Sequence, residues 1–191
     1  MIKLAVISGT DRPGSNALKV AEFVCEKYRA LDVDAFVVNL CDFPVADTAG
    51  GQYSGDIPSI KQFNEKIISA DGMVFVVPEY NGSYPGILKL FIDYLPYPRA
   101  FSKVPVSYIG ESDGKFGALR SIEQLQHVCG YRYTFNFPER VFITKVSKMF
   151  DEDEGPDDDF TKRLLDSQVK NFIRFVDALN QADLTKKKVP E

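Results

Sequence analysis

The stretch that most constrains the fold of this chain is residues 78–86, which read Pro-Glu-Tyr-Asn-Gly-Ser-Tyr-Pro-Gly. It follows an apolar run, residues 73–77, and precedes an amphipathic segment, residues 87–95. This order of strand, polar loop and helix indicates an α/β unit whose loop lies at the carboxyl end of a parallel strand, where open α/β sheets bind ligands. Prolines stiffen both ends of the loop, and its glycines Gly82 and Gly86 let the backbone approach a ligand closely. We therefore expect it to hold a flat polar molecule through backbone groups.

A second loop of the same kind lies near the start of the chain. Residues 3–8 predict a buried strand, and residues 9–16 read Gly-Thr-Asp-Arg-Pro-Gly-Ser-Asn before a helix expected to begin near Ser15. A helix N-terminus favours an anion, because its first N–H groups are unpaired and the dipole is positive there. Further donors come from polar side chains, namely Thr10, Arg12, Ser15 and Asn16. The loop is a candidate phosphate site; alternatively it is an ordinary turn with Ser15 as N-cap and Arg12 in solvent.

Together, the two loops resemble those of the NADPH-dependent FMN reductase family of flavodoxin-like proteins. The family's first loop has the form Gly-Ser-x-Arg-x-x-Ser, which here runs from Gly9 to Ser15 with Thr10 in place of serine. Its second loop has the form Pro-Glu-Tyr-Asn-x-Ser-x-Pro-Gly-x-Leu-Lys, and residues 78–89 match every specified position. The resemblance extends over residues 1 to about 145.

The resemblance implies a flavodoxin-like three-layer α/β/α sandwich around a five-stranded parallel sheet of order 2-1-3-4-5. It also implies FMN as cofactor, with NADPH or NADH as co-substrate. Residues 78–83 would contact the isoalloxazine ring, and the first loop would hold the phosphate. The third loop, residues 109–118, would form the third wall of the site, and it departs from the family with Phe116 in place of the first glycine of a Gly-Gly pair. The implied cofactor-binding residues are Gly9, Thr10, Arg12, Ser15, Asn16, Pro78, Glu79, Tyr80, Asn81, Gly82, Ser83, Ser112 and Gly114.

The rest of the chain alternates between apolar strands and amphipathic helices, which by itself predicts a three-layer α/β sandwich with a parallel sheet. Further strands are expected at residues 33–40 and 104–109, and a last strand region at 131–137 and 141–143, broken by Pro138. Helices are expected from Pro58, over 118–129 and over 165–179. Residues 44–57 read as an extended loop. Residues 1–182 are expected to form a single domain, and residues 183–191 a frayed tail.

Composition excludes several classes of function. The net charge of −4 offers no basic patch for nucleic acid. The sequence contains no apolar run long enough to span a bilayer and no signal-peptide pattern, so we expect a cytoplasmic protein without a membrane partner. The three cysteines, Cys25, Cys41 and Cys129, are odd in number and lack Cys-x-x-Cys spacing, which is typical of reduced thiols.

No side chain is expected to be catalytic or to bind a metal. Hydride transfer to a flavin needs no side-chain base at the reacting nitrogen, so Glu79 is interpreted as a loop residue. Tyr80 either stacks near the ring or reaches across a subunit boundary. The only histidine, His127, falls on a predicted helix without a partner motif. The acidic run 151–159 lacks EF-hand spacing and is interpreted as a solvated loop rather than a calcium site.

The sequence thus predicts an FMN-dependent oxidoreductase that passes hydride from NAD(P)H, by a ping-pong cycle, to a quinone, an azo compound, free flavin or a metal oxyanion. Two alternatives are a non-enzymatic electron carrier and a ligand-binding protein of this fold without turnover, in which the ring of Phe116 would fill the flavin's place. A homodimer or homotetramer is expected. The aromatic residues in and after the second loop either form its interface or fill the core: Tyr84, Phe91, Tyr94, Tyr97 and Phe101.

Overall fold

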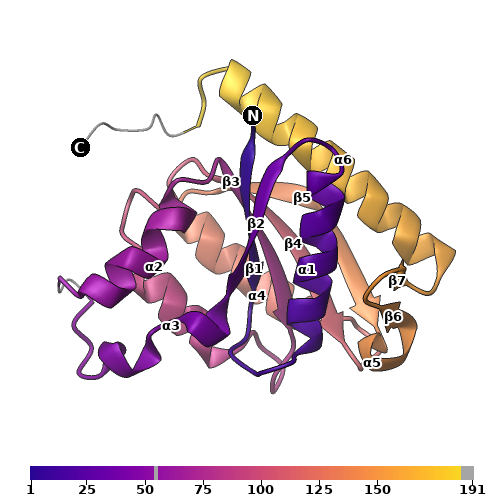
Figure 1. Ribbon diagram of the computed structural model, residues 1–191, viewed down its shortest axis with the longest axis horizontal. Helices are drawn as coiled ribbons and strands as arrows, with labels where there is room; N and C mark the ends of the chain where they lie inside the picture. Colours follow the sequence, from indigo (N-terminus) through magenta and orange to yellow (C-terminus); the bar gives the residue numbers. More distant parts are fainter. Residues whose placement is uncertain (54–55, 186–191) are drawn as a thin grey trace.

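The computed structural model describes residues 1–53 and 56–185. Within this part of the chain, strands and helices alternate from the N-terminus to the long C-terminal helix (Figure 1). The strands are β1 (Lys3–Ser8), β2 (Asp34–Asn39), β3 (Gly72–Pro78), β4 (Pro105–Ser112), β5 (Phe135–Thr144), β6 (Phe150–Asp151) and β7 (Gly155–Pro156). The helices are α1 (Asn16–Arg29), α2 (Pro58–Ile68), α3 (Gly86–Tyr94), α4 (Leu119–Tyr131), α5 (Val146–Met149) and α6 (Asp159–Gln181), with 3₁₀ turns η1 (Leu40–Asp42) and η2 (Val45–Thr48).

The central sheet has the order β2-β1-β3-β4-β5, and all its neighbouring strands are parallel. The predicted fold class and strand order are therefore confirmed. The strand ends are aligned, because Ser8 of β1 lies opposite Val76 of β3, and Pro78 lies opposite Glu111 of β4. The loops that follow β1, β3 and β4 consequently leave the sheet at one edge.

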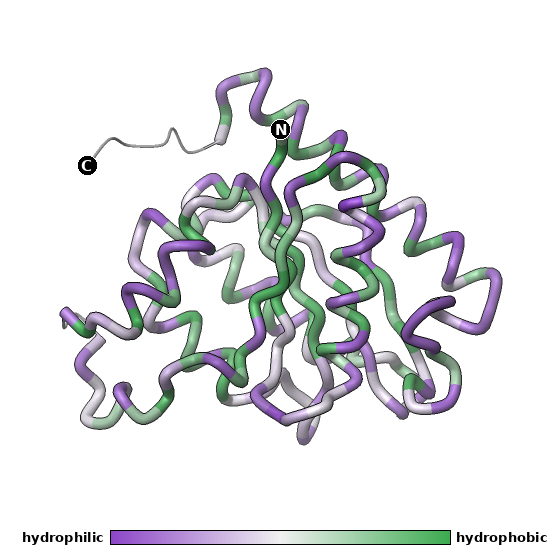
Figure 2. Tube along the Cα trace, in the orientation of Figure 1, coloured by the Kyte–Doolittle hydropathy of each residue, from purple (hydrophilic) through white to green (hydrophobic). Residues whose placement is uncertain are grey.

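Helices cover both faces of the sheet, and the strand sequences explain why. In β1, Leu4 and Val6 pack with α1 and α6, whereas Ala5 and Ile7 pack with α2, α3 and α4. Successive side chains of a strand point to opposite faces, so a strand buried on both faces must be apolar throughout. Figure 2 shows this as hydrophobic central strands, while α6 alternates between hydrophilic and hydrophobic turns.

The prediction that Pro138 breaks the last strand is wrong. Strand β5 runs through Pro138, and only the register against β4 shifts, between Val106 and Tyr108. A proline is tolerated there because β5 is the edge strand, where one side of the backbone needs no ladder partner. At this irregularity the buried side chain of Gln168, from α6, donates to the carbonyl oxygens of Tyr108 and Glu139, both at 2.9 Å.

Several other element boundaries differ from the expected ones. Helix α4 continues to Tyr131, so the residues expected to begin the last strand belong to the helix and the turn after it. Helix α6 begins at Asp159, six residues before the expected Leu165, because Asp158 caps it by accepting from the N–H of Thr161. The acidic run contains a short hairpin of β6 and β7, and the expected loop at 44–57 contains η2. Most of the expected frayed tail, residues 186–191, lies outside the described residues.

The aromatic residues proposed for a subunit interface mostly belong to the core. Phe91 and Phe101 are 0% exposed and Tyr94 is 7% exposed. Tyr84 is partly buried against the same cluster, and only Tyr97 is largely exposed, so the alternative that these rings fill the core is the correct one for most of them.

The contact of Gln168 generates a stability prediction. Replacing Gln168 with leucine keeps the volume of the side chain but removes the donor to two strand carbonyls, and it should lower the free energy of unfolding by about 1–3 kcal/mol. Urea denaturation monitored by circular dichroism measures this change. As a matched control, Gln181→Leu at the exposed end of α6 should change it by less than about 0.5 kcal/mol. Equal stability of the two variants would show that the hydrogen bonds of Gln168 at the register shift of β5 do not stabilise the fold.

Candidate functional site

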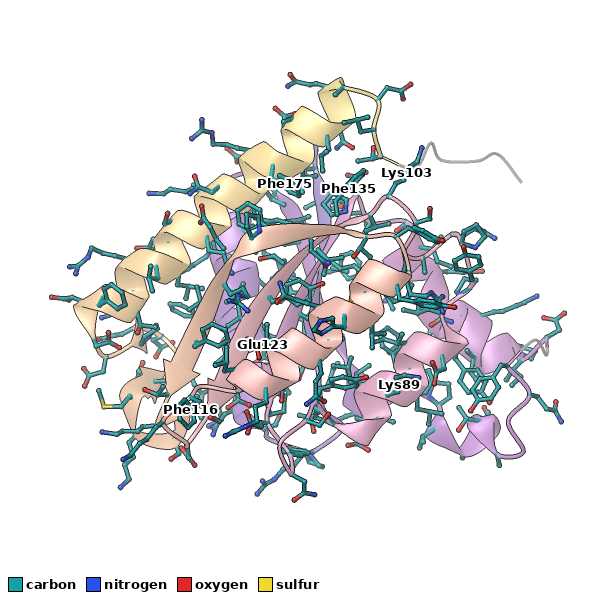
Figure 3. All side chains as sticks on the ribbon, turned by 180° about the vertical axis from the view of Figure 1, so that it is seen from behind. Lys89, Lys103, Phe116, Glu123, Phe135 and Phe175 are labelled. Atoms are coloured by element: carbon teal, nitrogen blue, oxygen red, sulfur yellow. The ribbon has the colours of Figure 1, made fainter. Side chains whose placement is uncertain are left out.

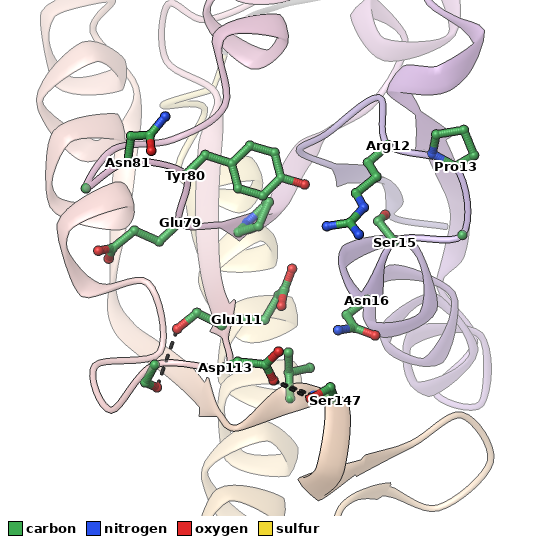
Figure 4. Close-up of a pocket in the computed structure, with 16 residues that line it drawn as sticks. Arg12, Pro13, Ser15, Asn16, Glu79, Tyr80, Asn81, Glu111, Asp113 and Ser147 are labelled. Carbon is green, nitrogen blue, oxygen red and sulfur yellow. Dashed lines mark hydrogen bonds between the residues drawn. The ribbon is translucent and has the colours of Figure 1, made fainter.

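A pocket of about 680 Å³ opens at the carboxyl edge of the sheet, where the loops after β1, β3 and β4 meet α5 (Figure 4). Its lining residues are Arg12, Pro13, Gly14, Ser15, Asn16, Pro78, Glu79, Tyr80, Asn81, Gly82, Glu111, Ser112, Asp113, Gly114, Val146 and Ser147. The pocket thus brings together parts of the three loops that the sequence indicated, and it adds residues after β5.

The first wall is the N-terminus of α1. Ser15 is the N-cap, and its hydroxyl oxygen accepts a hydrogen bond from the N–H of Leu18 at 3.1 Å. Because that contact uses the oxygen as acceptor, the hydroxyl hydrogen remains available as a donor. Arg12 and Asn16 direct their side chains toward the pocket (Figure 4). Gly14 has a φ of +63°, and no atom lies within 4 Å of the place where its Cβ would be, so the turn before the helix is open. This wall has the donor set of an anion site.

Two predicted residues of the first loop lie behind the pocket instead of lining it. Gly9 donates its N–H to the carbonyl of Val76 at 2.8 Å, and a Cβ on Gly9 would lie 2.9 Å from that oxygen. Thr10 is fully buried; its hydroxyl shares a hydrogen bond of 3.1 Å with the Tyr80 hydroxyl and accepts from the Arg12 N–H at 3.3 Å. Gly9 and Thr10 therefore hold the first loop against β3 and the second loop.

The second wall is a tight turn from Tyr80 to Ser83. Each of these two residues donates its N–H to the carbonyl of the other, at 2.8 and 3.1 Å. The two central residues, Asn81 and Gly82, both have positive φ, at +53° and +77°, which defines a type I′ turn. The sequence Asn-Gly is the preferred one for this turn, because both residues tolerate the left-handed conformation. Gly82 therefore serves this turn through its positive φ.

Helix α4 fixes this turn from behind. Arg120 forms an ion pair of 2.9 Å with Glu79, and Ser121 donates to the carbonyl of Pro78 at 3.0 Å. Gln124 donates to the carbonyl of Gly82 at 3.1 Å and accepts from the Ser83 hydroxyl at 2.6 Å. Ser83 therefore faces α4 and is not among the lining residues, although the sequence placed it in the site. The carboxylate of Glu79 is directed away from the centre of the pocket (Figure 4).

The third wall joins the loop after β4 to the segment after β5. Asp113 accepts hydrogen bonds from the backbone N–H and the hydroxyl of Ser147, at 2.9 and 2.6 Å. These two contacts lower the pKa of Asp113, so the carboxyl is held as a carboxylate. Ser112 and Gly114 line the pocket as the sequence indicated. Val146 and Ser147 were not anticipated, because no pattern in the sequence brings the end of β5 to this loop.

Phe116 lies outside the pocket. Its ring is 59% exposed and stands 5.2 Å from the guanidinium carbon of Arg120, at the outer end of α4 (Figure 3). It is not a lining residue, so the structure does not place its ring where a ligand of the pocket would lie. The structure therefore does not support the alternative in which the ring of Phe116 occupies the flavin's place.

Glu111 is the most unusual residue of the pocket, and sequence reasoning did not assign it to the site. It belongs to the end of β4, and it is only 4% exposed. Burial, and secondarily the charge of Asp113, raises its pKa to about 7. The signal was available, because Glu111 lies two residues after the apolar part of a central strand, inside the third loop.

The donor set fits a mononucleotide with a flat ring. One end of the pocket offers a helix N-terminus with Arg12, Ser15 and Asn16, which suits a terminal monophosphate. The other end offers the backbone of a rigid turn beside Tyr80. Among the residues that the structure describes, His, Cys, Asp and Glu side chains form no group of three or more that could hold a metal ion. Fold and pocket together define a flavodoxin-like nucleotide-binding protein.

Comparison with known families agrees with this class. The model of the NADPH-dependent FMN reductase family matches residues 2–148, and the chain belongs to that family. It is therefore a flavin-dependent oxidoreductase of NAD(P)H, with FMN as the cofactor of the family. It is 30% identical over 181 residues to an NAD(P)H-dependent FMN reductase of Pseudomonas aeruginosa, covering 88% of this chain and 92% of the relative. It is 32% identical over 134 residues to an FMN-dependent NADPH-azoreductase of Staphylococcus haemolyticus, covering 66% of this chain and 67% of the relative.

Solved structures of the same fold include the flavoenzyme NAD(P)H:(acceptor) oxidoreductase FerB of Paracoccus denitrificans. It superposes with a TM-score of 0.78 at 23% identity, covering 93% of this chain and 98% of FerB. A flavodoxin of Pseudomonas aeruginosa superposes with a TM-score of 0.56 at 16% identity, covering 94% and 99% of the two chains. The fold is therefore shared by an NAD(P)H oxidoreductase and a flavodoxin, and the assignment of this chain to its family rests on the sequence match.

The geometry of the second wall generates a prediction about Gly82. A β-branched residue cannot adopt its φ of +77° without strain, so Gly82→Val should distort the turn and weaken flavin binding. Glu79→Gln should weaken it less, because the side chain points away from the pocket and keeps a partner in Arg120. Fluorescence titration of the two apo-proteins with FMN measures both effects. Loss of turnover by an FMN-loaded Glu79→Gln variant would instead reveal an acid–base role of Glu79.

Proposed function

We propose that this pocket binds FMN and that the protein transfers reducing equivalents from NAD(P)H to a second small-molecule acceptor at the same site, in a ping-pong cycle. One observation carries the proposal. A phosphate-type helix N-terminus and a rigid type I′ turn line the same pocket, at the carboxyl ends of the adjacent strands β1 and β3.

The three walls of the pocket would bind different parts of FMN. Arg12, Ser15 and Asn16, with the first N–H groups of α1, would hold the phosphate. Residues 78–82 would hold the ring mainly through the backbone, and Ser112 and Gly114 would form the third wall. Gly9, Thr10 and Ser83 would support these walls from behind, through the contacts described above.

When bound, FMN supplies the redox chemistry: it accepts hydride from NAD(P)H and returns electrons to the acceptor. The protein would hold the two reactants close together and oriented, which is what a hydride transfer requires of it. No side chain is proposed as nucleophile or base. Burial raises the pKa of Cys25 to about 11 and that of Cys129 to about 12, so neither is a reactive thiolate at neutral pH. His127 is exposed on α4 and does not line the pocket.

The acceptor is proposed by chemical class: a quinone, an azo compound, free flavin or a metal oxyanion. A homodimer or homotetramer is proposed with it on the family resemblance, and a cytoplasmic location on the cysteine pattern and the lack of a signal-peptide pattern in the sequence. None of the helices in residues 1–53 and 56–185 is both long and apolar enough to cross a membrane.

Steady-state kinetics tests the cycle. Initial rates of NADPH oxidation would be measured at several fixed concentrations of a quinone acceptor, with purified FMN-loaded protein. Parallel double-reciprocal lines are the expected result, because the two substrates use one site in turn. Intersecting lines would contradict the ping-pong scheme, and the absence of steady NADPH oxidation would favour an electron carrier over a reductase.

Arg12 provides a prediction specific to the phosphate. Its guanidinium can make charge-assisted hydrogen bonds worth roughly 1.5–3 kcal/mol, so Arg12→Ala should weaken FMN binding by about one to two orders of magnitude. Riboflavin lacks the phosphate, and its affinity should change little.

The test compares the ratio of FMN affinity to riboflavin affinity between the native protein and the Arg12→Ala variant. A collapse of this ratio in the variant supports the phosphate role of Arg12. Equal weakening of both ligands would mean that Arg12 shapes the loop, and no change in either would leave the phosphate to Ser15, Asn16 and the helix N-terminus.

A further inference from the structure

Glu111 directs a carboxyl group into the pocket. It is 4% exposed, and among residues 1–53 and 56–185 its side chain has no hydrogen bond or ion pair. Figure 4 shows the carboxyl directed into the pocket, between the N-terminus of α1 and the loop after β3. Because the residue is nearly buried and its carboxyl faces the pocket, a ligand bound there is the group that can supply its hydrogen-bond partner.

The groups that face Glu111 come from every wall. The loop after β1 brings Arg12, which has no ion pair with Glu111, and the loop after β4 brings Asp113, whose negative charge opposes ionisation of Glu111. The other carboxylate of the pocket, Glu79, is paired with Arg120 and points away. The uncharged polar side chains that line the pocket are Ser15, Asn16, Tyr80, Asn81, Ser112 and Ser147.

The surroundings of Glu111 favour its neutral, protonated form over the carboxylate. Burial and the neighbouring Asp113 raise the pKa of Glu111 to about 7, so both forms are populated at neutral pH. The neutral form has an O–H that can donate a hydrogen bond, whereas the ionised form can only accept.

We propose, resting on the FMN site above, that Glu111 is a cofactor-binding residue that acts in its protonated form: its O–H donates a hydrogen bond to an oxygen of bound FMN, and loss of this proton weakens binding. FMN offers hydroxyl and carbonyl oxygens as acceptors. Its phosphate is nearly fully dianionic above pH 7. An ionised Glu111 would place a further negative charge in the same pocket, where water screens it poorly.

The direction of the pH effect follows from this linkage. Bound FMN favours the protonated carboxyl, so binding above pH 7 takes a proton from the buffer. FMN affinity is therefore highest below the pKa of Glu111 in the free protein and falls as the pH rises through it. The limiting slope is about a tenfold rise in Kd per pH unit.

The test measures the Kd of FMN by fluorescence titration of the apo-protein between pH 7 and 9, for the native sequence and for Glu111→Gln. Glutamine has nearly the same shape, keeps a donor and cannot ionise. The native protein should lose about tenfold or more in affinity over this range, and the variant about twofold or less. Glu123→Gln, an exposed position on α4, is the matched control and should follow the native profile (Figure 3).

A second measurement needs no variant. Isothermal titration calorimetry at pH 8, in buffers of different ionisation enthalpy, counts the protons taken up when FMN binds. The native protein should take up a substantial fraction of one proton, and Glu111→Gln close to none.

FMN binding with no proton uptake and a flat pH profile would overturn this inference and leave the proposed function intact. An identical pH dependence in the native protein and in Glu111→Gln would overturn it as well. No binding of FMN at any pH would overturn both proposals.

Discussion

Burial of the sheet on both faces is the constraint on which the site depends. Strands β1 and β3 are apolar at nearly every position, and each sends alternate side chains into the two layers of helices. A parallel sheet covered in this way must be connected by helices that cross over it, so every strand in it begins and ends at the same edges. The loops after β1, β3 and β4 therefore meet although they are far apart in the sequence. Since the core fills both faces, their polar residues have only the carboxyl edge in which to gather.

The sequence was sufficient for whatever depends on local pattern. Unbroken apolar runs predicted the central strands, and the pair Asn81-Gly82 carries the chemistry of a type I′ turn in two residues. Ser15 was expected at the start of α1, and it is the N-cap. The strand order and the FMN assignment came instead from the resemblance of two loops to a known family, because periodicity alone does not order parallel strands.

Contacts between distant segments could not be predicted from the sequence. Pro138 was expected to end a strand, because a proline removes a ladder hydrogen bond; the edge position of β5 and the donor Gln168 from α6 explain why it does not. Ser83 was assigned to the pocket by its place in a motif, yet its hydroxyl bonds Gln124 of α4. Ser147 lines the pocket and donates to Asp113 from a segment 34 residues further along the chain. Each of these facts depends on which helix lies behind which strand.

The contacts between α4 and the second loop affect the free energy of ligand binding. Two side chains of α4, Ser121 and Gln124, donate to backbone carbonyls of the second loop, and Arg120 pairs with the side chain of Glu79. The turn also closes on itself through two backbone hydrogen bonds. This wall is therefore preorganised in the protein itself. A ring that docks against it does not have to order a flexible loop, so little conformational entropy is lost at this step. Affinity at the ring end then reflects the quality of the contact itself, and exchange of one flat reactant for another leaves the wall unchanged.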